Sequence, residues 1–181
     1  SDTTSAVLLT RTEQDRSRFP DDPVCGHYLG YLEDRPDEVV GALRNIARAD
    51  GAAVIHCAAG KDRTGVVAAL ALAAAGVRPQ AVVADYAASG ERTDALIARL
   101  RRSPTYAPDI NSRPAASHRV RPETMAAFLE QMDTRHGGAS RWLADHGFSP
   151  EDLRLLRAKL RDRADLPASP AQPVSHDGRA S

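Results

Sequence analysis

Ten consecutive residues carry most of the side chains in this sequence that could do chemistry: His56-Cys57-Ala58-Ala59-Gly60-Lys61-Asp62-Arg63-Thr64-Gly65. A cysteine is a strong nucleophile as a thiolate, and nearby cations or a helix N-terminus favour that form. The planar guanidinium of an arginine can bind two oxygens of a phosphoryl group at once. The spacing of Cys57 and Arg63 therefore predicts nucleophilic attack by Cys57 on a phosphate ester that Arg63 holds.

The other residues of this segment, which we call the His56–Gly65 loop, have supporting chemistry. Gly60 supplies the backbone freedom for a tight turn in which successive amides face inward and bind an anion. We expect Thr64 to donate a hydrogen bond to the thiolate and His56 to orient the loop through its ring nitrogens. The predicted phosphate-binding residues are Ala58, Ala59, Gly60, Lys61, Asp62, Arg63 and Thr64.

Simpler interpretations compete with this one. The pattern Cys-x5-Arg is weak by itself in an arginine-rich chain, so Cys57 could be a buried core residue and Lys61 a solvated loop charge. The loop lacks the glycine spacing and the Ser/Thr of a nucleoside-triphosphate-binding loop, and His56 with Cys57 are too few ligands for zinc. A sulfurtransferase also uses a loop cysteine, but Arg63-Thr64-Gly65 suits phosphate better.

A buried strand and a buried helix must position this loop. We expect the strand over 52–56 and an apolar helix over 65–75, which Gly76 ends. Upstream, Val7–Leu9 and Val24–Leu32 are candidate strands, and Pro36 begins a helix whose apolar residues share one face. The second half is predicted to be helical, with a proline-interrupted connection from Ser103 to Arg121. This order predicts an α/β fold: a small, largely parallel central sheet flanked by helices, with a helical C-terminal half.

Individual residues outside the loop receive predictions from their context. Tyr86 and Trp142 are expected in the core, where Cys25 also packs, since no arginine lies six residues after it. A solvated surface is the simpler interpretation of four basic residues that could also line the pocket mouth: Arg113, His118, Arg119 and Arg121. The Pro/Ser/Ala-rich residues 164–181 are predicted to form a flexible tail.

Composition excludes several classes of protein. The 181 residues carry 24 basic and 24 acidic side chains, so the net charge is zero and broad nucleic-acid binding is not expected. Aromatic residues make up only 4%, too few for a platform that stacks single-stranded bases. Two cysteines cannot form a disulfide framework or a structural zinc site. Without a visible signal peptide or a membrane-spanning apolar run, the expected location is the cytoplasm, and secretion without a visible signal is the alternative.

The His56–Gly65 loop resembles the active-site loop of the cysteine-dependent protein tyrosine phosphatase superfamily. More narrowly, it is similar to the atypical bacterial tyrosine and dual-specificity phosphatases of the mycobacterial phosphatase B type. Three other segments are similar to family landmarks: Leu9–Glu13, Val83–Tyr86 and Val120–Glu123. The resemblance implies a phosphatase domain over 1–163 that lacks the family's N-terminal segment. One edge of its sheet is then exposed, and an exposed edge favours pairing with a second chain, so the expected state is a monomer or a homodimer. By analogy, Arg11 faces the loop.

The resemblance also implies a mechanism that needs no metal and no cofactor. Cys57 forms a cysteinyl-phosphate that water then hydrolyses, while Arg63 and the loop amides stabilise the charge on phosphorus-bound oxygens. Many relatives carry their general acid, an aspartate, on a separate loop, and no convincing equivalent of that loop is found in this sequence. Asp62, which lies in the His56–Gly65 loop itself, is therefore the favoured general acid. The fallback candidates are Asp21, Asp22 and Asp34.

The substrate class stays open at this level. A phosphotyrosine or phosphoserine protein, a phosphoinositide and a small phosphate ester all present the same group to the loop. Lys61 matches a lysine that phosphoinositide phosphatases carry, which keeps multiply phosphorylated substrates open. The alternative from another class is a pseudophosphatase that binds phosphate without turnover, although intact Cys57, Arg63 and Thr64 favour an enzyme.

Overall fold

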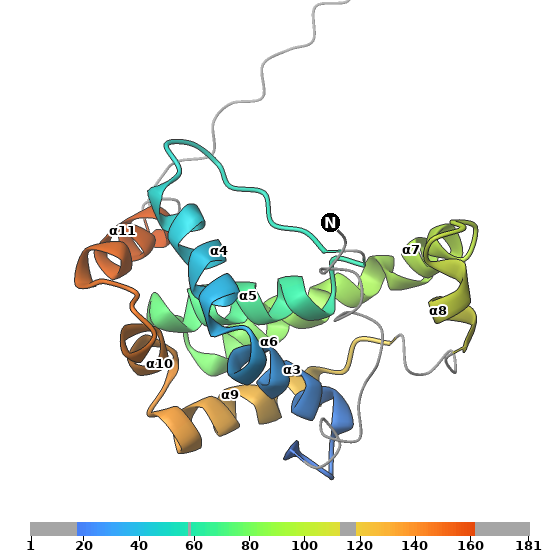
Figure 1. The fold of residues 1–181 in the computed structure, drawn as a ribbon, viewed down its shortest axis with the longest axis horizontal. Coiled ribbons are helices and arrows are strands. Elements are labelled where there is room, and N and C mark those ends of the chain that lie inside the picture. Colours follow the sequence, from blue (N-terminus) through green and yellow to red (C-terminus); the bar gives the residue numbers. More distant parts are fainter. Residues whose placement is uncertain (1–17, 58, 113–118, 162–181) are drawn as a thin grey trace, which may run out of the picture.

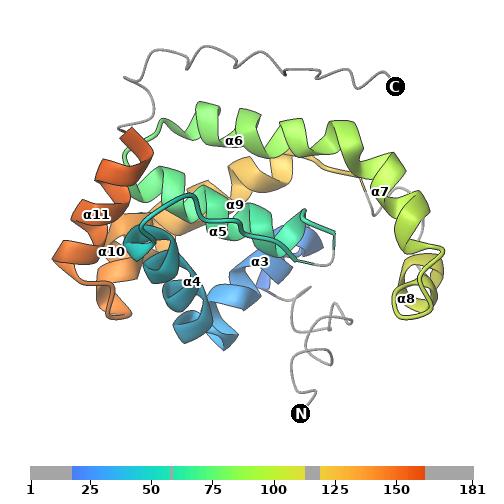
Figure 2. The same ribbon diagram turned by 90° about the horizontal axis from the view of Figure 1, so that it is seen from above.

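Helices build the fold of this protein, as Figures 1 and 2 show for the computed structural model. The structure describes residues 18–57, 59–112 and 119–161. In chain order the helices are α3 (Pro23–Asp34), α4 (Pro36–Arg48), α5 (Asp62–Ala74), α6 (Pro79–Ala88), the 3-10 helix η1 (Ser89–Arg92), α7 (Thr93–Leu100), α8 (Ala107–Ser112), α9 (Pro122–His136), α10 (Ala139–Asp145) and α11 (Pro150–Arg161). Helices α7 and α8 extend away from the others (Figure 2), and α8 lies in the connection for which the sequence predicted no helix.

Several predicted features lie outside the described residues: the strand Val7–Leu9, Arg11, Ala58, Arg113, His118 and the tail 164–181.

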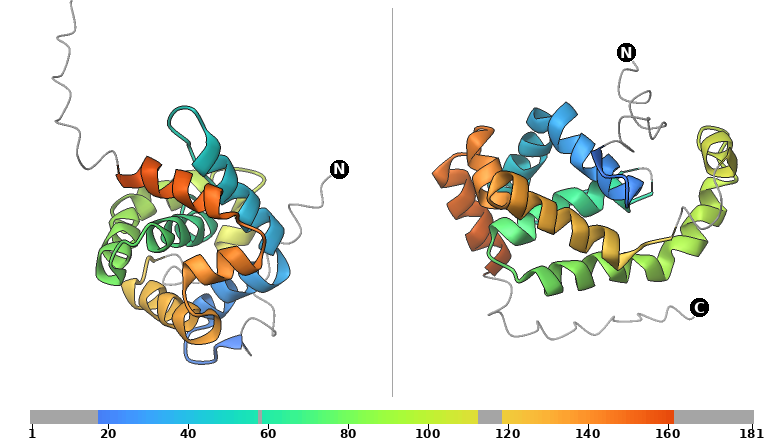
Figure 3. Two further views of the ribbon diagram at one scale, coloured as in Figure 1. Left: turned by 90° about the vertical axis from the view of Figure 1, so that its left-hand side faces the viewer. Right: turned by 90° about the horizontal axis from the view of Figure 1, so that it is seen from below.

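The helix that follows the His56–Gly65 loop is the centre of the molecule. Helix α5 contacts α3, α4, α6, α10 and α11, and Figure 3 shows it enclosed by other helices. Its buried residues, Val66, Ala69, Leu70, Ala71 and Ala74, lie on several sides of the helix. Gly76, with φ of 88°, follows its C-terminal end. The prediction of a central apolar helix ended by Gly76 is therefore confirmed, although the helix begins at Asp62 rather than near Gly65.

The predicted central parallel sheet is wrong for the part of the chain that the structure describes. Residues 52–57 run as a single extended segment between α4 and α5, with no strand beside them in the described ranges. Val54 is 87% exposed, so its side chain is not part of a core. A strand needs a neighbour to satisfy its backbone N–H and C=O groups, and the helices that surround this segment cannot supply one.

The predicted strand over Val24–Leu32 is also wrong, because these residues form helix α3. Asp22 caps the helix, its Oδ1 accepting from the backbone N–H groups of Val24 at 2.9 Å and Cys25 at 3.3 Å. Pro23 occupies the first turn, where its missing N–H costs nothing. The spacing i, i+3, i+4, i+7 then buries one face of the helix: Cys25, Tyr28, Leu29 and Leu32.

Helix α4 precedes the extended segment and packs against α11. Its predicted apolar face is buried: Val39, Val40, Leu43, Ile46 and Ala47. Asp152 of α11, 1% exposed, accepts from Arg48 Nε at 2.6 Å and Arg44 Nε at 3.3 Å. Asp152 also forms a capping box with Ser149, its carboxylate accepting from the Ser149 amide at 3.1 Å. These contacts fix the helix that precedes the loop.

The same contacts determine the ionisation of Asp152. Burial alone would raise the pKa of its carboxyl group, but the hydrogen bonds from Arg48, Ser149 and Arg44 outweigh burial and lower the pKa to about 2.

Candidate active site

The His56–Gly65 loop turns sharply between the extended segment and α5. Gly60 has φ of 61°, in the left-handed region that favours glycine, so its predicted role in the turn is confirmed. The Gly65 amide donates to the Lys61 carbonyl at 2.8 Å, which begins the hydrogen-bonding pattern of α5. Cys57 lies before the turn and Arg63 in the first turn of the helix, so the turn brings both to the N-terminus of α5.

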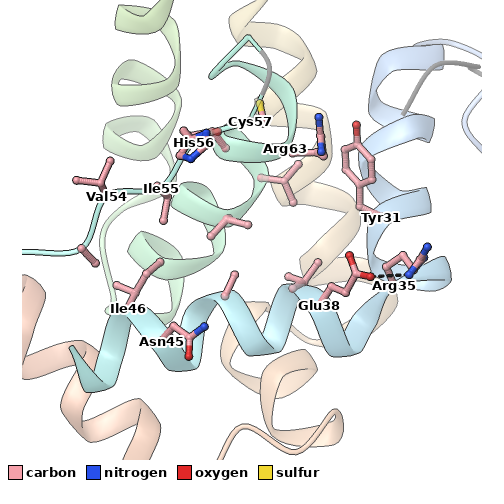
Figure 4. A pocket seen from close by; sticks show the side chains of 16 residues that line it. Tyr31, Arg35, Glu38, Asn45, Ile46, Val54, Ile55, His56, Cys57 and Arg63 are labelled. Atoms are coloured by element: carbon pink, nitrogen blue, oxygen red, sulfur yellow. Dashed lines mark hydrogen bonds and ion pairs between the residues drawn. The ribbon is translucent and has the colours of Figure 1, made fainter. Parts of the chain in front are cut away.

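Cys57 and Arg63 line one cavity of about 580 Å³. Its walls are the extended segment, α4, the first turns of α5, and Tyr31 and Arg35 from the end of α3. Figure 4 shows Cys57, Arg63 and Tyr31 toward one end, and the ion pair between Arg35 and Glu38 toward the other. Among the described residues no acidic side chain pairs with Arg63, so its guanidinium is available to an anion.

The surroundings of Cys57 favour its thiolate. Burial pushes the pKa of the thiol upward, but the hydroxyl and amide of Thr64, the charge of Arg63 and the amide of Lys61 outweigh it and bring the pKa below its ordinary value. The Thr64 hydroxyl is buried and has no hydrogen-bond partner among the described residues, although its proximity to the sulfur lowers the pKa of Cys57. A direct hydrogen bond from Thr64 to the sulfur stays a prediction.

The other cysteine has the opposite environment. Cys25 is fully buried in α3, where burial and then the charge of Asp22 raise the pKa of its thiol to about 12. The prediction that Cys25 packs in the core is confirmed, and so are the buried positions of Tyr86 and Trp142. Of the two thiols, only that of Cys57 is tuned for ionisation.

Asp62 is the first residue of α5; it is not among the residues that line the cavity, and its side chain is partly exposed. Its Oδ1 accepts from the Tyr28 hydroxyl at 2.7 Å and lies 3.6 Å from Lys61 Nζ. Lys61 is only 9% exposed, which contradicts the alternative that it is a solvated loop charge. Sequence reasoning missed Tyr28, although the apolar spacing around it in α3 could have shown that it faces the core.

The remaining predicted residues lie elsewhere or stay untested. Asp22 accepts from the Thr124 hydroxyl at 2.6 Å and Asp34 from Arg18 at 2.8 Å, while Asp21 is exposed, and none of these three fallback acids lines the cavity. Arg119 and Arg121 are exposed, away from the cavity lining. His56 lines the cavity but makes no ring hydrogen bond within the described ranges, so its orienting role stays a prediction.

Within residues 18–57, 59–112 and 119–161, no three His, Cys, Asp or Glu side chains gather as ligands for a metal ion. In the same ranges, no helix has the length and apolar character that crossing a membrane requires.

Thr64 offers a direct test of the Cys57 environment. In Thr64→Val the sulfur loses a hydroxyl donor but keeps the backbone amides and Arg63, so the pKa of Cys57 rises and less thiolate is present at a given pH. We expect the midpoint of the pH profile for alkylation by iodoacetamide to move to higher pH. The control Thr134→Val, which removes a hydroxyl bonded to Glu130 on the exposed face of α9, should leave the midpoint unchanged. An unshifted midpoint in Thr64→Val would show that its hydroxyl does not serve the sulfur.

Comparison with known proteins agrees with this site. The chain is 32% identical over 138 residues to a tyrosine-protein phosphatase of Nostoc commune, an alignment that covers 74% of this chain and 46% of that protein. It is 34% identical over 116 residues to the triple specificity protein phosphatase PtpB of Mycobacterium tuberculosis, covering 58% and 42% of the two chains. The chain thus spans less than half the length of these curated relatives. A family model described as "Tyrosine phosphatase family" matches residues 2–162, and the chain therefore belongs to that family.

Proposed function

We propose that this chain hydrolyses phosphate monoesters through a cysteinyl-phosphate on Cys57, as a protein tyrosine or dual-specificity phosphatase. The observation that carries the proposal is that a thiol with a lowered pKa lines the same cavity as Arg63, which has no acidic partner among the residues that the structure describes. The names of the two relatives support the same chemistry. Residues 1–163 form the proposed phosphatase domain.

In the first step, the Cys57 thiolate attacks phosphorus and the bond between phosphorus and the leaving oxygen breaks. Asp62 gives its proton to that oxygen, so the alcohol or phenol departs neutral. Arg63 binds two equatorial oxygens with its guanidinium fork, and the amides at the N-terminus of α5 bind the negative charge as well.

In the second step, water attacks phosphorus and gives a proton to Asp62, while the bond between sulfur and phosphorus breaks. Inorganic phosphate leaves and Cys57 returns as a thiolate, which the Thr64 hydroxyl stabilises. Because Arg63 and the amides supply the positive charge, we expect turnover to continue in the presence of a chelator.

The proposed substrate is a phosphorylated protein, and an aromatic phosphate suits the cavity best. Tyr31 and apolar side chains of α4 and α5, among them Val39, Ile46 and Val67, line the cavity beside Cys57. A phenyl ring would bury apolar surface against them.

Trapping the intermediate tests this function. The protein is mixed with p-nitrophenyl phosphate and chelator, quenched with acid during turnover and digested for mass spectrometry. We expect the mass of one phosphoryl group on the peptide that contains Cys57 and none on the peptide that contains Cys25. Release of p-nitrophenol with no phosphorylated cysteine would contradict the covalent mechanism. Binding of phosphate with no release of p-nitrophenol would identify a pseudophosphatase.

A further inference from the structure

Two buried tyrosines connect Asp62 to the core. Tyr28 on α3 donates its hydroxyl hydrogen to Asp62 Oδ1 at 2.7 Å, and its oxygen lies 2.7 Å from the hydroxyl of Tyr86 on α6. Tyr28 is 0% exposed and Tyr86 is 5% exposed. A chain of two hydrogen bonds therefore links α3, α5 and α6, and it ends on the carboxyl group proposed as the general acid.

The donors in this hydrogen-bond chain follow from the bond between Tyr28 and Asp62. A phenol has one hydrogen to donate, and that of Tyr28 goes to Asp62. Tyr86 must therefore donate to the Tyr28 oxygen. Burial, followed by the negative charge of Asp62, raises the pKa of Tyr28 well above its ordinary range, so Tyr28 stays protonated and remains a donor.

Packing holds the two rings in place. A Cβ at position 65 would lie 2.9 Å from Cδ2 and Cε2 of Tyr86, so the absence of a side chain at Gly65 lets the Tyr86 ring approach the backbone of α5 closely. The Tyr28 ring meets Tyr86 edge-on at 6.4 Å and Phe128 of α9 edge-on at 6.1 Å. These contacts restrict rotation of both side chains, so the Tyr28 hydroxyl stays beside Asp62 and the Tyr86 hydroxyl beside that of Tyr28.

The two oxygens of Asp62 have different surroundings. The contacts from Tyr28 and Lys61 both go to Oδ1. Within the described residues, no hydrogen bond or ion pair involves Oδ2. The carboxyl group is therefore anchored through one oxygen, and the other is available to a proton.

We propose that Tyr28 and Tyr86 are positioning residues that fix Asp62 through Oδ1, so that Oδ2 carries the transferred proton. The inference rests on the proposed function, in which Asp62 protonates the leaving oxygen. When Oδ2 gives up its proton, a negative charge forms on the carboxylate, and the hydrogen bond from Tyr28 becomes charge-assisted and stronger. When water returns a proton to Oδ2, Tyr28 is again a donor to a neutral carboxyl group, so neither tyrosine gains or loses a proton.

A leaving-group comparison separates positioning of the acid from general support of the fold. Phenyl phosphate needs protonation of its leaving oxygen, whereas 2,4-dinitrophenyl phosphate releases a stable anion and needs little. We expect Tyr28→Phe to lower kcat for phenyl phosphate about tenfold and that for 2,4-dinitrophenyl phosphate less than about twofold. Asp62→Asn should show the same selectivity with a loss of about a hundredfold or more. Tyr86→Phe, one bond further away, should lose about twofold to threefold on phenyl phosphate.

The double variant Asp62→Asn/Tyr28→Phe completes the test. If Tyr28 acts through Asp62, the double variant should be no slower on phenyl phosphate than Asp62→Asn, within about twofold. The matched control is Tyr106→Phe, which removes the phenol hydroxyl of a residue that is 37% exposed just before α8, and which should change neither rate. Each variant is measured well below its own melting temperature, so that loss of folded protein does not enter.

The outcomes distinguish the two proposals. Equal losses of Tyr28→Phe on both substrates, or losses that multiply in the double variant, would show a structural role and overturn the inference while the phosphatase function stands. An Asp62→Asn variant without leaving-group selectivity would also overturn it, because Asp62 would not be the acid. No turnover of either substrate by the wild type, together with no phosphoryl group trapped on Cys57, would overturn the proposed function and the inference with it.

Discussion

The variant Cys57→Ser should lose essentially all phosphatase activity, with kcat for p-nitrophenyl phosphate falling about ten-thousandfold or more. The oxygen of serine replaces the attacking sulfur, but a hydroxyl holds its proton far more tightly than a thiol. Thr64, Arg63 and the amide of Lys61 lower the pKa of the Cys57 thiol, but an alcohol starts from a far higher pKa and stays protonated in the same surroundings. The measurement is the release of p-nitrophenol under saturating substrate with chelator present.

Cys25→Ala is the matched control for this variant. It removes the other thiol, which is fully buried and lies outside the cavity lining, so kcat should stay within about twofold of wild type at a temperature where the variant is folded. Retained binding of vanadate by Cys57→Ser would show that the site is still assembled. Activity in Cys57→Ser near the wild-type rate would exclude Cys57 as the nucleophile.

The second large effect is expected at Arg63. Arg63→Ala removes the charge that binds two equatorial oxygens and should lower kcat/KM by about a thousandfold to ten-thousandfold. Arg63→Lys keeps the positive charge but loses the planar fork, so it should recover only part of this loss and remain at least about a hundredfold below wild type. The ranking follows from geometry, since a lysine cannot hold two oxygens in one plane.

An arginine away from the site controls for the loss of charge alone. Arg154→Ala removes an exposed guanidinium that pairs with Glu151 on α11, and kcat/KM should be unchanged. If Arg63→Lys matched the wild type, a point charge would be enough and bidentate binding would be wrong. If Arg154→Ala fell as far as Arg63→Ala, the effect would be one of net charge or folding.

The loop chemistry could be predicted from sequence because it is local. Cys57, Gly60, Arg63 and Thr64 lie within eight consecutive residues, and a turn followed by a helix is enough to bring them together. The helices α4 and α5 could be predicted for the same reason, since α4 has a proline at its start and one apolar face, and α5 is a short apolar run followed by a glycine.

The sequence predicted a sheet wrongly for the described part of the chain and took α3 for a strand, for two different physical reasons. A strand depends on a partner elsewhere in the chain, so the apolar run before Cys57 predicts an extended backbone but not its neighbour. In α3, Gly26 and Gly30 weaken helical propensity, while the cap of Asp22 and burial of Tyr28 and Leu29 overcome it. Burial outweighs propensity when several large side chains reach the core from one face.

The contact between Tyr28 and Asp62 lies beyond sequence patterns altogether. The two residues are 34 positions apart, and Tyr28 and Tyr86 are 58 apart. Nothing in the spacing of single tyrosines within separate helices shows that their hydroxyls meet. That meeting depends on how α3, α5 and α6 pack, and on the missing side chain of Gly65.

The buried carboxylate of Asp152 makes the stability of the fold depend on pH. Its pKa of about 2 in the folded chain lies below the value of about 3.9 that an aspartate has when the chain is unfolded. The unfolded chain therefore binds more protons at this residue between those two values. The stability that Asp152 contributes is fully present above the unfolded pKa and is lost as pH falls toward about 2. Acid tolerance in the helix that leads to Cys57 thus depends on a carboxylate about a hundred residues downstream, through its pairs with Arg44 and Arg48.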